Sequence, residues 1–200
     1  MRYTATGDTG RYSGIMILPI YVYGAPILTQ RTVEVKENTE AVQQLIDDMI
    51  ETMRGALGIG LAAPQVGRSE RLFVVDLSPM LEEENEGPLD PMVFINPEIY
   101  DESEEDEEYE EGCLSIPDIR EYVIRPEGIR LRFLDRNFEQ HDIAADGMLA
   151  RVIQHEFDHL EGILFLDHLS AFKKRLLKRR LSEMKKGNVE ADYPLKFETV

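Results

Sequence analysis

Two histidines four residues apart, His155 and His159, flank Glu156 in the segment QHEFDH. Residues four apart on an α-helix lie on one face with Cβ atoms about 5–6 Å apart, so both imidazoles could bind one metal ion. Glu156 directly follows the first histidine, too close to share the ion comfortably but well placed to move protons to and from a bound water. The H-E-x-x-H pattern also arises by chance in helices with two surface histidines, so its surroundings must decide.

The element that positions these residues is predicted to be a central helix. It opens at Asp146–Gly147 and runs to about Glu161, and Gly162 ends it. Its apolar positions include Leu149, Val152, Ile153 and Leu160. They cover most of the helix circumference, which predicts burial. Burying two histidines and two acids without partners is costly, and a metal ion would offset that cost.

A hydrolytic metal ion needs a third protein ligand and one open coordination position. Downstream, Glu161 lies only two residues beyond His159, and Asp167 and His168 lie past the glycine break. Upstream, the single cysteine of the chain, Cys113, lies in the segment EGCLS. Taken alone, a lone cysteine is more often a small buried hydrophobe. A thiolate is nevertheless a good ligand for a borderline or soft divalent ion, which makes Cys113 the candidate.

The elements around this helix indicate an α+β fold. An amphipathic helix is predicted from Asn38 to about Leu57, with Asn38 or Thr39 as its N-cap. Residues 58–67 contain three glycines and a proline and cannot form a regular helix. The predicted strands are residues 71–77, 92–97, 121–126 and 128–135, with a short strand or turn at 140–146. We expect largely antiparallel sheets packed around the central helix that carries the H-E-x-x-H motif, plus a C-terminal helix.

Length and composition are those of one globular domain. The chain has 200 residues, of which 42% are hydrophobic and 30% charged. We expect a single catalytic domain at residues 16–186, a flexible extension at 1–15 and a C-terminal tail at 187–200. No apolar stretch approaches the ~20 residues that span a bilayer, and the start lacks the layout of a secretory signal. These features predict a cytoplasmic protein with no membrane segment.

Charge is distributed unevenly along the chain. The net charge of −17 argues against general binding to a nucleic-acid backbone. Residues 101–111 contain nine acids, for which a solvated loop is predicted. Residues 173–186 contain eight lysines or arginines and one glutamate. This basic stretch lies on the last predicted helix, near residues 170–186, whose apolar stripe is Phe172, Leu176, Leu177, Leu181 and Met184.

Three segments resemble the signature motifs of bacterial peptide deformylases, in the same order and with similar separations. They are GIGLAAPQ at 58–65, EGCLS at 111–115 and QHEFDH at 154–159. Residues 17–28 are also similar to the N-terminal segment of that family, and the resemblance extends over about residues 16–186. The segments at 78–91 and 101–111 are longer than expected for a compact member.

The resemblance implies hydrolytic removal of the N-formyl group from the formylmethionine of newly made polypeptides, with release of formate. It implies one divalent ion per chain, Fe²⁺ natively, in a site that Zn²⁺, Ni²⁺ or Co²⁺ can also occupy. Carried over to this sequence, the metal ligands are Cys113, His155 and His159. Glu156 is then the general base and acid, which takes a proton from the metal-bound water and delivers it to the leaving amine.

The same resemblance assigns the developing negative charge on the formyl oxygen to the side-chain amide of Gln65 and the backbone N–H of Leu114, with the metal itself. Ile59 and Gly60 would pair with the substrate main chain as an added strand would. The other residues expected to contact substrate are Glu111, Gly112, Arg120 and Met148. Arg120 could equally form a surface salt bridge, and Met148 could simply fill the core.

Two other functions compete with this interpretation. A general metallopeptidase would have a third histidine or glutamate ligand downstream at helix-compatible spacing, which this sequence lacks. A ribosome-associated protein with a structural metal would normally have four protein ligands, whereas only three candidates are present. The resemblance also implies docking on the ribosome through a C-terminal helix. The basic segment at 170–186 fits electrostatic docking to RNA without sequence-specific recognition, and it fits an ordinary solvated helix face equally well.

Overall fold

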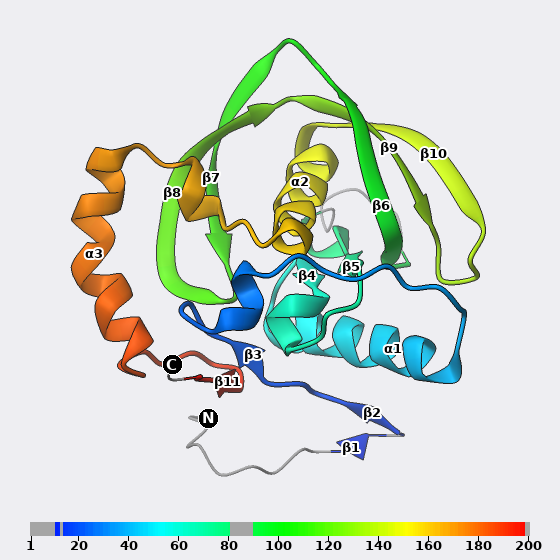
Figure 1. Cartoon of the computed structure of the whole chain (residues 1–200), viewed down its shortest axis with the longest axis horizontal. Helices are drawn as coiled ribbons and strands as arrows, with labels where there is room; N and C mark the ends of the chain where they lie inside the picture. Colours follow the sequence, from blue (N-terminus) through cyan, green and yellow to red (C-terminus); the bar gives the residue numbers. More distant parts are fainter. Residues whose placement is uncertain (1–10, 13, 81–89, 199–200) are drawn as a thin grey trace.

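The computed structural model describes residues 11–12, 14–80 and 90–198 (Figure 1). The helices are α1 (Glu40–Gly55), α2 (Gly147–Glu161) and α3 (Ala171–Lys185), with short 3₁₀ turns η1 (Pro26–Thr29), η2 (Ala63–Val66), η3 (Ser78–Met80) and η4 (Phe165–His168). The strands are β1 (Arg11–Tyr12), β2 (Ile15–Met16), β3 (Ile20–Tyr21), β4 (Gly60–Ala62), β5 (Leu72–Val75), β6 (Met92–Glu102), β7 (Asp106–Cys113), β8 (Ile116–Pro126), β9 (Gly128–Leu134), β10 (Gln140–Asp146) and β11 (Leu195–Lys196).

Antiparallel pairing dominates the sheets. The largest sheet has five antiparallel strands in the order β10-β9-β6-β5-β4. Strands β7 and β8 form a long antiparallel hairpin, β1 and β2 a short one, and β3 pairs in parallel with β11. Helix α2 lies in the middle, between the five-stranded sheet and the β7–β8 hairpin (Figure 1). This arrangement confirms the predicted α+β fold around a central helix.

Local patterns explain most of these elements. The Thr39 side chain accepts a hydrogen bond from the Val42 N–H and caps α1, which ends at Gly55, slightly earlier than expected. In β9, alternate residues enter the core and face solvent, as the sequence predicted. The buried residues on β9 are Ile129, Leu131 and Phe133. They pack in one cluster with Ala150, Ile153 and Leu160 of α2.

The prediction of a solvated loop at residues 101–111 was wrong. Its first two residues end β6, and residues from Asp106 onward form β7. The acids at 104–110 are indeed exposed, but from Asp106 onward their backbone is paired with β8, for example Glu107 with Arg125. The charge of a segment predicts contact with water, and a strand of a two-stranded hairpin can have that contact as well as a loop can.

The apolar stripe predicted for α3 was partly wrong. Leu177 and Met184 are buried and Leu181 is half-buried, but Phe172 and Leu176 are 68% and 65% exposed. The helix therefore contacts the rest of the protein along a narrower face than its sequence suggested.

The two ends of the expected domain also make contacts. Residues 187–198 include β11, which pairs with β3. Strands β1 and β2 form a hairpin at the end of the expected N-terminal extension. Residues 1–10 and 13 of that extension lie outside the described part of the chain. The domain limits at 15 and 186 stay predictions. None of the helices in the described residues is long and apolar enough to cross a membrane.

Candidate metal centre

Helix α2 carries the H-E-x-x-H motif into the interior. His155, Glu156 and His159 are all buried, in a helix whose stretch from Ala150 to Glu156 is buried throughout. The helix ends at Gly162, where φ is +74° and a Cβ atom would lie 2.7 Å from the backbone of Thr29. Only glycine suits that position, so the predicted helix and its end are confirmed.

Cys113 meets the two histidines at the end of β7. The register of β7 with β8 shifts between Gly112 and Cys113, and this irregularity directs the thiol toward α2. Cys113 Sγ lies 3.2 Å from His159 Nε2, although the residues are 46 positions apart. One ligand atom from each of Cys113, His155 and His159 lies within 4.8 Å of the others, so together they could hold one metal ion.

The chemistry of this group fits a divalent ion. One thiolate and two imidazoles suit Fe²⁺, Zn²⁺, Co²⁺ or Ni²⁺. Burial, together with the charge of His155, lowers the pKa of His159 to about 3, so this imidazole is neutral, as metal ligation requires. Among the buried side-chain atoms of the described residues, Glu156 Oε2 and His159 Nδ1 have no hydrogen-bond partner.

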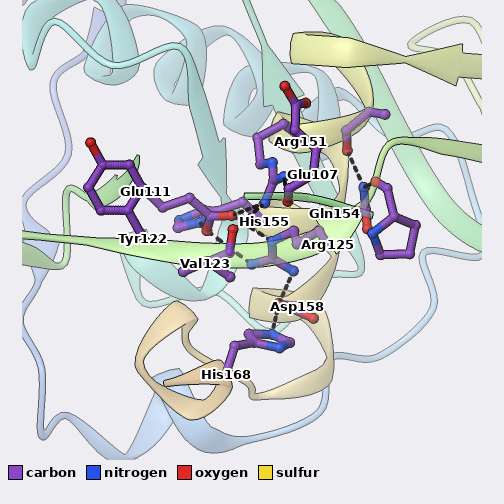
Figure 2. Close-up of polar contacts among 12 residues, drawn as sticks. Glu107, Glu111, Tyr122, Val123, Arg125, Arg151, Gln154, His155, Asp158 and His168 are labelled. Atoms are coloured by element: carbon purple, nitrogen blue, oxygen red, sulfur yellow. Dashed lines mark hydrogen bonds and ion pairs between the residues drawn. The ribbon is translucent and has the colours of Figure 1, made fainter. Parts of the chain in front are cut away.

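A buried carboxylate fixes the orientation of His155. The Nδ1 atom of His155 lies 2.9 Å from Glu111, which leaves Nε2 as the ring nitrogen that could bind an ion. Glu111 also accepts hydrogen bonds from Arg125 at 2.7 and 3.1 Å and from Arg151 at 3.1 Å (Figure 2). The sequence predicted Glu111 only as a wall of the substrate pocket. Glu111 does line the cleft, and the carboxylate in addition supports a candidate ligand.

The polar network continues away from the metal centre. Arg125 donates to Asp158 at 2.7 Å, and Asp158 lies 2.7 Å from Nε2 of His168 on η4 (Figure 2). Arg151 of α2 also donates to the carbonyls of Val123 and Glu107, and so links α2 to both strands of the hairpin. The sequence interpretation missed the two arginines. The available signal was the two-residue period of β8, which puts Arg125 on the same face as the buried Val123.

Gln65 faces the metal centre from η2. Its Oε1 accepts a hydrogen bond from the Ala62 N–H at 2.7 Å, which fixes the orientation of the amide. Its Nε2 then points inward, 3.4 Å from Cys113 Sγ and 3.4 Å from Ser115 Oγ. Gln65 is 1% exposed, so the amide is held in a dry position beside the candidate ligands.

Glu156 faces the backbone of β4. A Cβ atom at Gly60 would lie 2.4 Å from Glu156 Oε1, so glycine is required there for the carboxylate to take its place. Burial raises the pKa of Glu156 to about 7. A carboxyl with that pKa can both accept and release a proton near neutral pH, and a nearby cation would lower the value.

One cleft of about 1970 Å³ joins these groups. Its lining includes the metal-centre residues Cys113, His155 and Glu156, with Gln65 and Leu114 beside them. It also includes every residue predicted to contact substrate, namely Ile59, Gly60, Glu111, Gly112, Arg120 and Met148. The cleft follows β4, which is an edge strand of the five-stranded sheet and can pair with an extended peptide.

Comparison with known proteins identifies the family. The family model for polypeptide deformylase matches residues 17–175. The chain belongs to the polypeptide deformylase family. Among curated relatives, the peptide deformylase of Salinibacter ruber is 65% identical over 184 residues, which cover 90% of this chain and 94% of that protein. The peptide deformylase of Cytophaga hutchinsonii is 47% identical, with 91% and 98% covered.

Solved structures of deformylases share the fold. The Legionella pneumophila peptide deformylase has a TM-score of 0.74 at 38% identity, over 85% of this chain and 96% of its own. The Ehrlichia chaffeensis enzyme, solved in complex with actinonin, has a TM-score of 0.75 at 39% identity, with 84% and 96% covered. Deformylases are metal-dependent hydrolases, and this membership confirms the resemblance found in the sequence.

Proposed function

We propose that this deformylase removes the N-formyl group from the formylmethionine of newly made polypeptides and releases formate, in the cytoplasm where such chains are made. The observation that carries the proposal is the convergence of ligand atoms of Cys113, His155 and His159 within 4.8 Å, beside a cleft that Gln65 and Glu156 line. A purely structural metal site would not need the last two residues in those positions, since neither is required to hold the ion.

The three ligands would hold one divalent ion, for which Fe²⁺ is the expected native choice. When bound, such an ion polarises a carbonyl group and makes a water molecule a stronger nucleophile near neutral pH. Glu111 would keep the His155 ring in the orientation that presents Nε2 to the ion. Zn²⁺, Ni²⁺ and Co²⁺ satisfy the same donor set.

Glu156 is placed to move the protons of the reaction. Its carboxylate would accept a proton from the attacking water and deliver it to the departing amine. Burial raises the pKa of Glu156 and a bound ion would lower it again, and the absence of a side chain at Gly60 leaves room for the carboxylate at the substrate backbone. One residue can therefore act as base and then as acid within a single turnover.

Two neutral donors would stabilise the charge that develops on the formyl oxygen. One is Gln65 Nε2, aimed inward because Oε1 is bound to the Ala62 N–H. The other is the backbone N–H of Leu114, next to Cys113 in the cleft wall. A well-aimed donor of this kind lowers the activation free energy by about 2.7–4 kcal/mol.

Substrate would bind along β4, the last strand of the five-stranded sheet. Ile59 and Gly60 would pair with its main chain, as a further strand of the sheet. Glu111, Gly112, Arg120 and Met148 line the cleft and would surround the methionine side chain.

The experiment is a formate-release assay on formylmethionyl peptides. Protein purified without oxygen and loaded with Fe²⁺ should release formate, and chelation should stop the reaction until metal is restored. The unformylated peptide is the control, and cleavage of its internal peptide bonds would support a general peptidase instead. Absence of formate from fully iron-loaded protein would refute the proposal.

Helix α3 is the proposed contact with the ribosome. Its exposed residues include Arg175, Lys178 and Arg179, next to the exposed Phe172 and Leu176. Several basic groups close to apolar side chains fit an RNA-rich surface, on a protein whose overall net charge is −17.

Reversing three of these charges should abolish ribosome binding. We expect the triple variant Arg175→Glu, Lys178→Glu and Arg179→Glu to lose ribosome co-sedimentation at low salt, since each basic group near RNA adds to a salt-dependent attraction. Activity on short formylated peptides should not change, because none of the three residues lines the cleft. Unchanged co-sedimentation would exclude α3 as the contact.

A further inference from the structure

The chain folds back on itself after α3. We call residues 187–198 the C-terminal strap. In it, β11 runs parallel to β3, as the red and blue strands show in Figure 1. The carbonyls of Pro194 and Lys196 accept hydrogen bonds from the N–H groups of Ile20 and Val22, at 2.9 and 3.0 Å. The strap thereby forms one wall of the same cleft that Glu156 lines.

The strap makes a specific contact with the loop that carries the candidate ligand Cys113. The Tyr193 hydroxyl donates a hydrogen bond to the Leu114 carbonyl at 2.8 Å. Tyr193 is half-buried, and its ring packs in the same hydrophobic cluster as the Leu114 side chain. Burial raises the pKa of Tyr193 well above its ordinary value, so the hydroxyl keeps its proton and remains a donor near neutral pH.

The turn at Cys113–Ser115 depends on such contacts. It joins β7 to β8 just where their register shifts, so the regular ladder does not fix its peptide groups. The Ser115 carbonyl accepts a hydrogen bond from the Tyr23 N–H at 2.8 Å. Two successive carbonyls of the turn are therefore bound by residues that lie next to paired strands. Tyr193, just before β11, binds the Leu114 carbonyl, and Tyr23, just after β3, binds the Ser115 carbonyl. The Leu114 N–H belongs to the preceding peptide group, which lies between Cys113 and the bound Leu114 carbonyl. A shift of that carbonyl would therefore reorient the N–H through the backbone torsions of Leu114.

We propose that Tyr193 is a positioning residue for the deformylase reaction, whose hydroxyl holds the Leu114 carbonyl so that the Leu114 N–H stays aimed at the formyl oxygen. This inference rests on the proposed function. Tyr193 itself acts through Leu114 and exchanges no proton or bond with the substrate.

The variant Tyr193→Phe isolates this effect. It keeps the ring that packs in the core and the backbone pairing of β11, and removes only the hydroxyl. A donor that is only partly misaligned stabilises the transition state less, so we expect kcat to fall roughly tenfold. KM should stay within about twofold, because the lost interaction forms fully only in the transition state.

The test uses full-length, metal-loaded protein and a formylmethionyl tripeptide. Tyr122→Phe is the matched control, since Tyr122 is exposed on β8 and removed from the cleft lining. Metal content and inhibition by the unformylated product should be the same in both variants and in the wild type, and the melting temperature of Tyr193→Phe should fall by only a few degrees, as one lost hydrogen bond predicts. The product lacks the formyl oxygen, so its inhibition constant measures binding in the cleft and does not depend on the Leu114 N–H.

A second measurement follows Leu114 directly. In zinc-loaded protein labelled with ¹⁵N-leucine, the Leu114 amide should show additional microsecond–millisecond exchange in Tyr193→Phe. An active wild type with an unchanged kcat in Tyr193→Phe would overturn the inference alone. A rise in KM and in the product inhibition constant at constant kcat would also overturn it, because the strap would then be only a wall. A wild type that releases no formate would instead remove the proposed function.

Discussion

Replacing Glu156 with alanine should abolish formate release and leave the metal in place. Glu156 is 4% exposed and would be the residue that moves protons, and proton transfer by a positioned side chain contributes typically 10²–10⁴-fold to rate. The three candidate ligands are untouched by the change. Formate release per bound ion, with metal content measured on the same sample, gives the result directly.

The matched variant is Cys113→Ala, which should lose both metal and activity. Its thiol is one of the three candidate ligands found among the described residues, and the Glu156 carboxylate does not belong to that group. Full metal content in Cys113→Ala would contradict the ligand assignment. Loss of metal in Glu156→Ala would mean that the carboxylate supports the ion itself and would contradict its role as a proton carrier.

Replacing Glu111 with glutamine should destabilise the fold and weaken metal binding together. Its buried carboxylate accepts from Arg125 and Arg151 and orients His155, so neutralising it leaves buried cations poorly paired. Breaking a buried pair in this way costs about 3–5 kcal/mol of the free energy of unfolding. Loss of the carboxylate behind a histidine ligand typically lowers metal affinity 10–100-fold. Urea unfolding with a chelator present and metal titration measure the two effects separately.

The effect of Glu111→Gln should depend on pH. Burial by itself raises the pKa of Glu111, but His155 and Arg125 outweigh it and hold the pKa well below the ordinary 4.5. The stabilisation is therefore complete above about pH 4.5 and is lost as pH falls toward the pKa of the folded state. The difference in the free energy of unfolding between wild type and variant should narrow only below about pH 4.5. Asp142→Asn is the control, since its ion pair with Arg132 is exposed and should change stability by less than about 1 kcal/mol.

The sequence predicted best what depends on local spacing. Helix α2, its glycine end and the closeness of His155 and His159 follow from residues within one helix. The pattern of β9 was equally readable, because alternation of apolar and basic residues is a property of the strand alone. Cys113 could be proposed from its chemistry and from the family resemblance, although its 46-residue separation from His159 is bridged only by the fold.

What the sequence could not predict depends on pairing between distant segments. The acids at 104–110 looked like a loop because no single-strand pattern reveals that β8 lies beside them. The same holds for Glu111, whose partners Arg125 and Arg151 come from β8 and α2. Tyr193 is the clearest case, since nothing near it in the chain suggests a contact with Leu114. The role of each site residue stays a prediction until the variants are measured.

The meeting of β7 with α2 has a consequence for how the ion is acquired. Because Cys113 and His159 come from two separate elements, an ion bound to both could leave through the cleft only after its bonds to both elements have opened. Such openings are rare excursions from the native state. Exchange with metal in the buffer should therefore be slow, and the ion found in purified protein should record which metal was abundant while the chain folded.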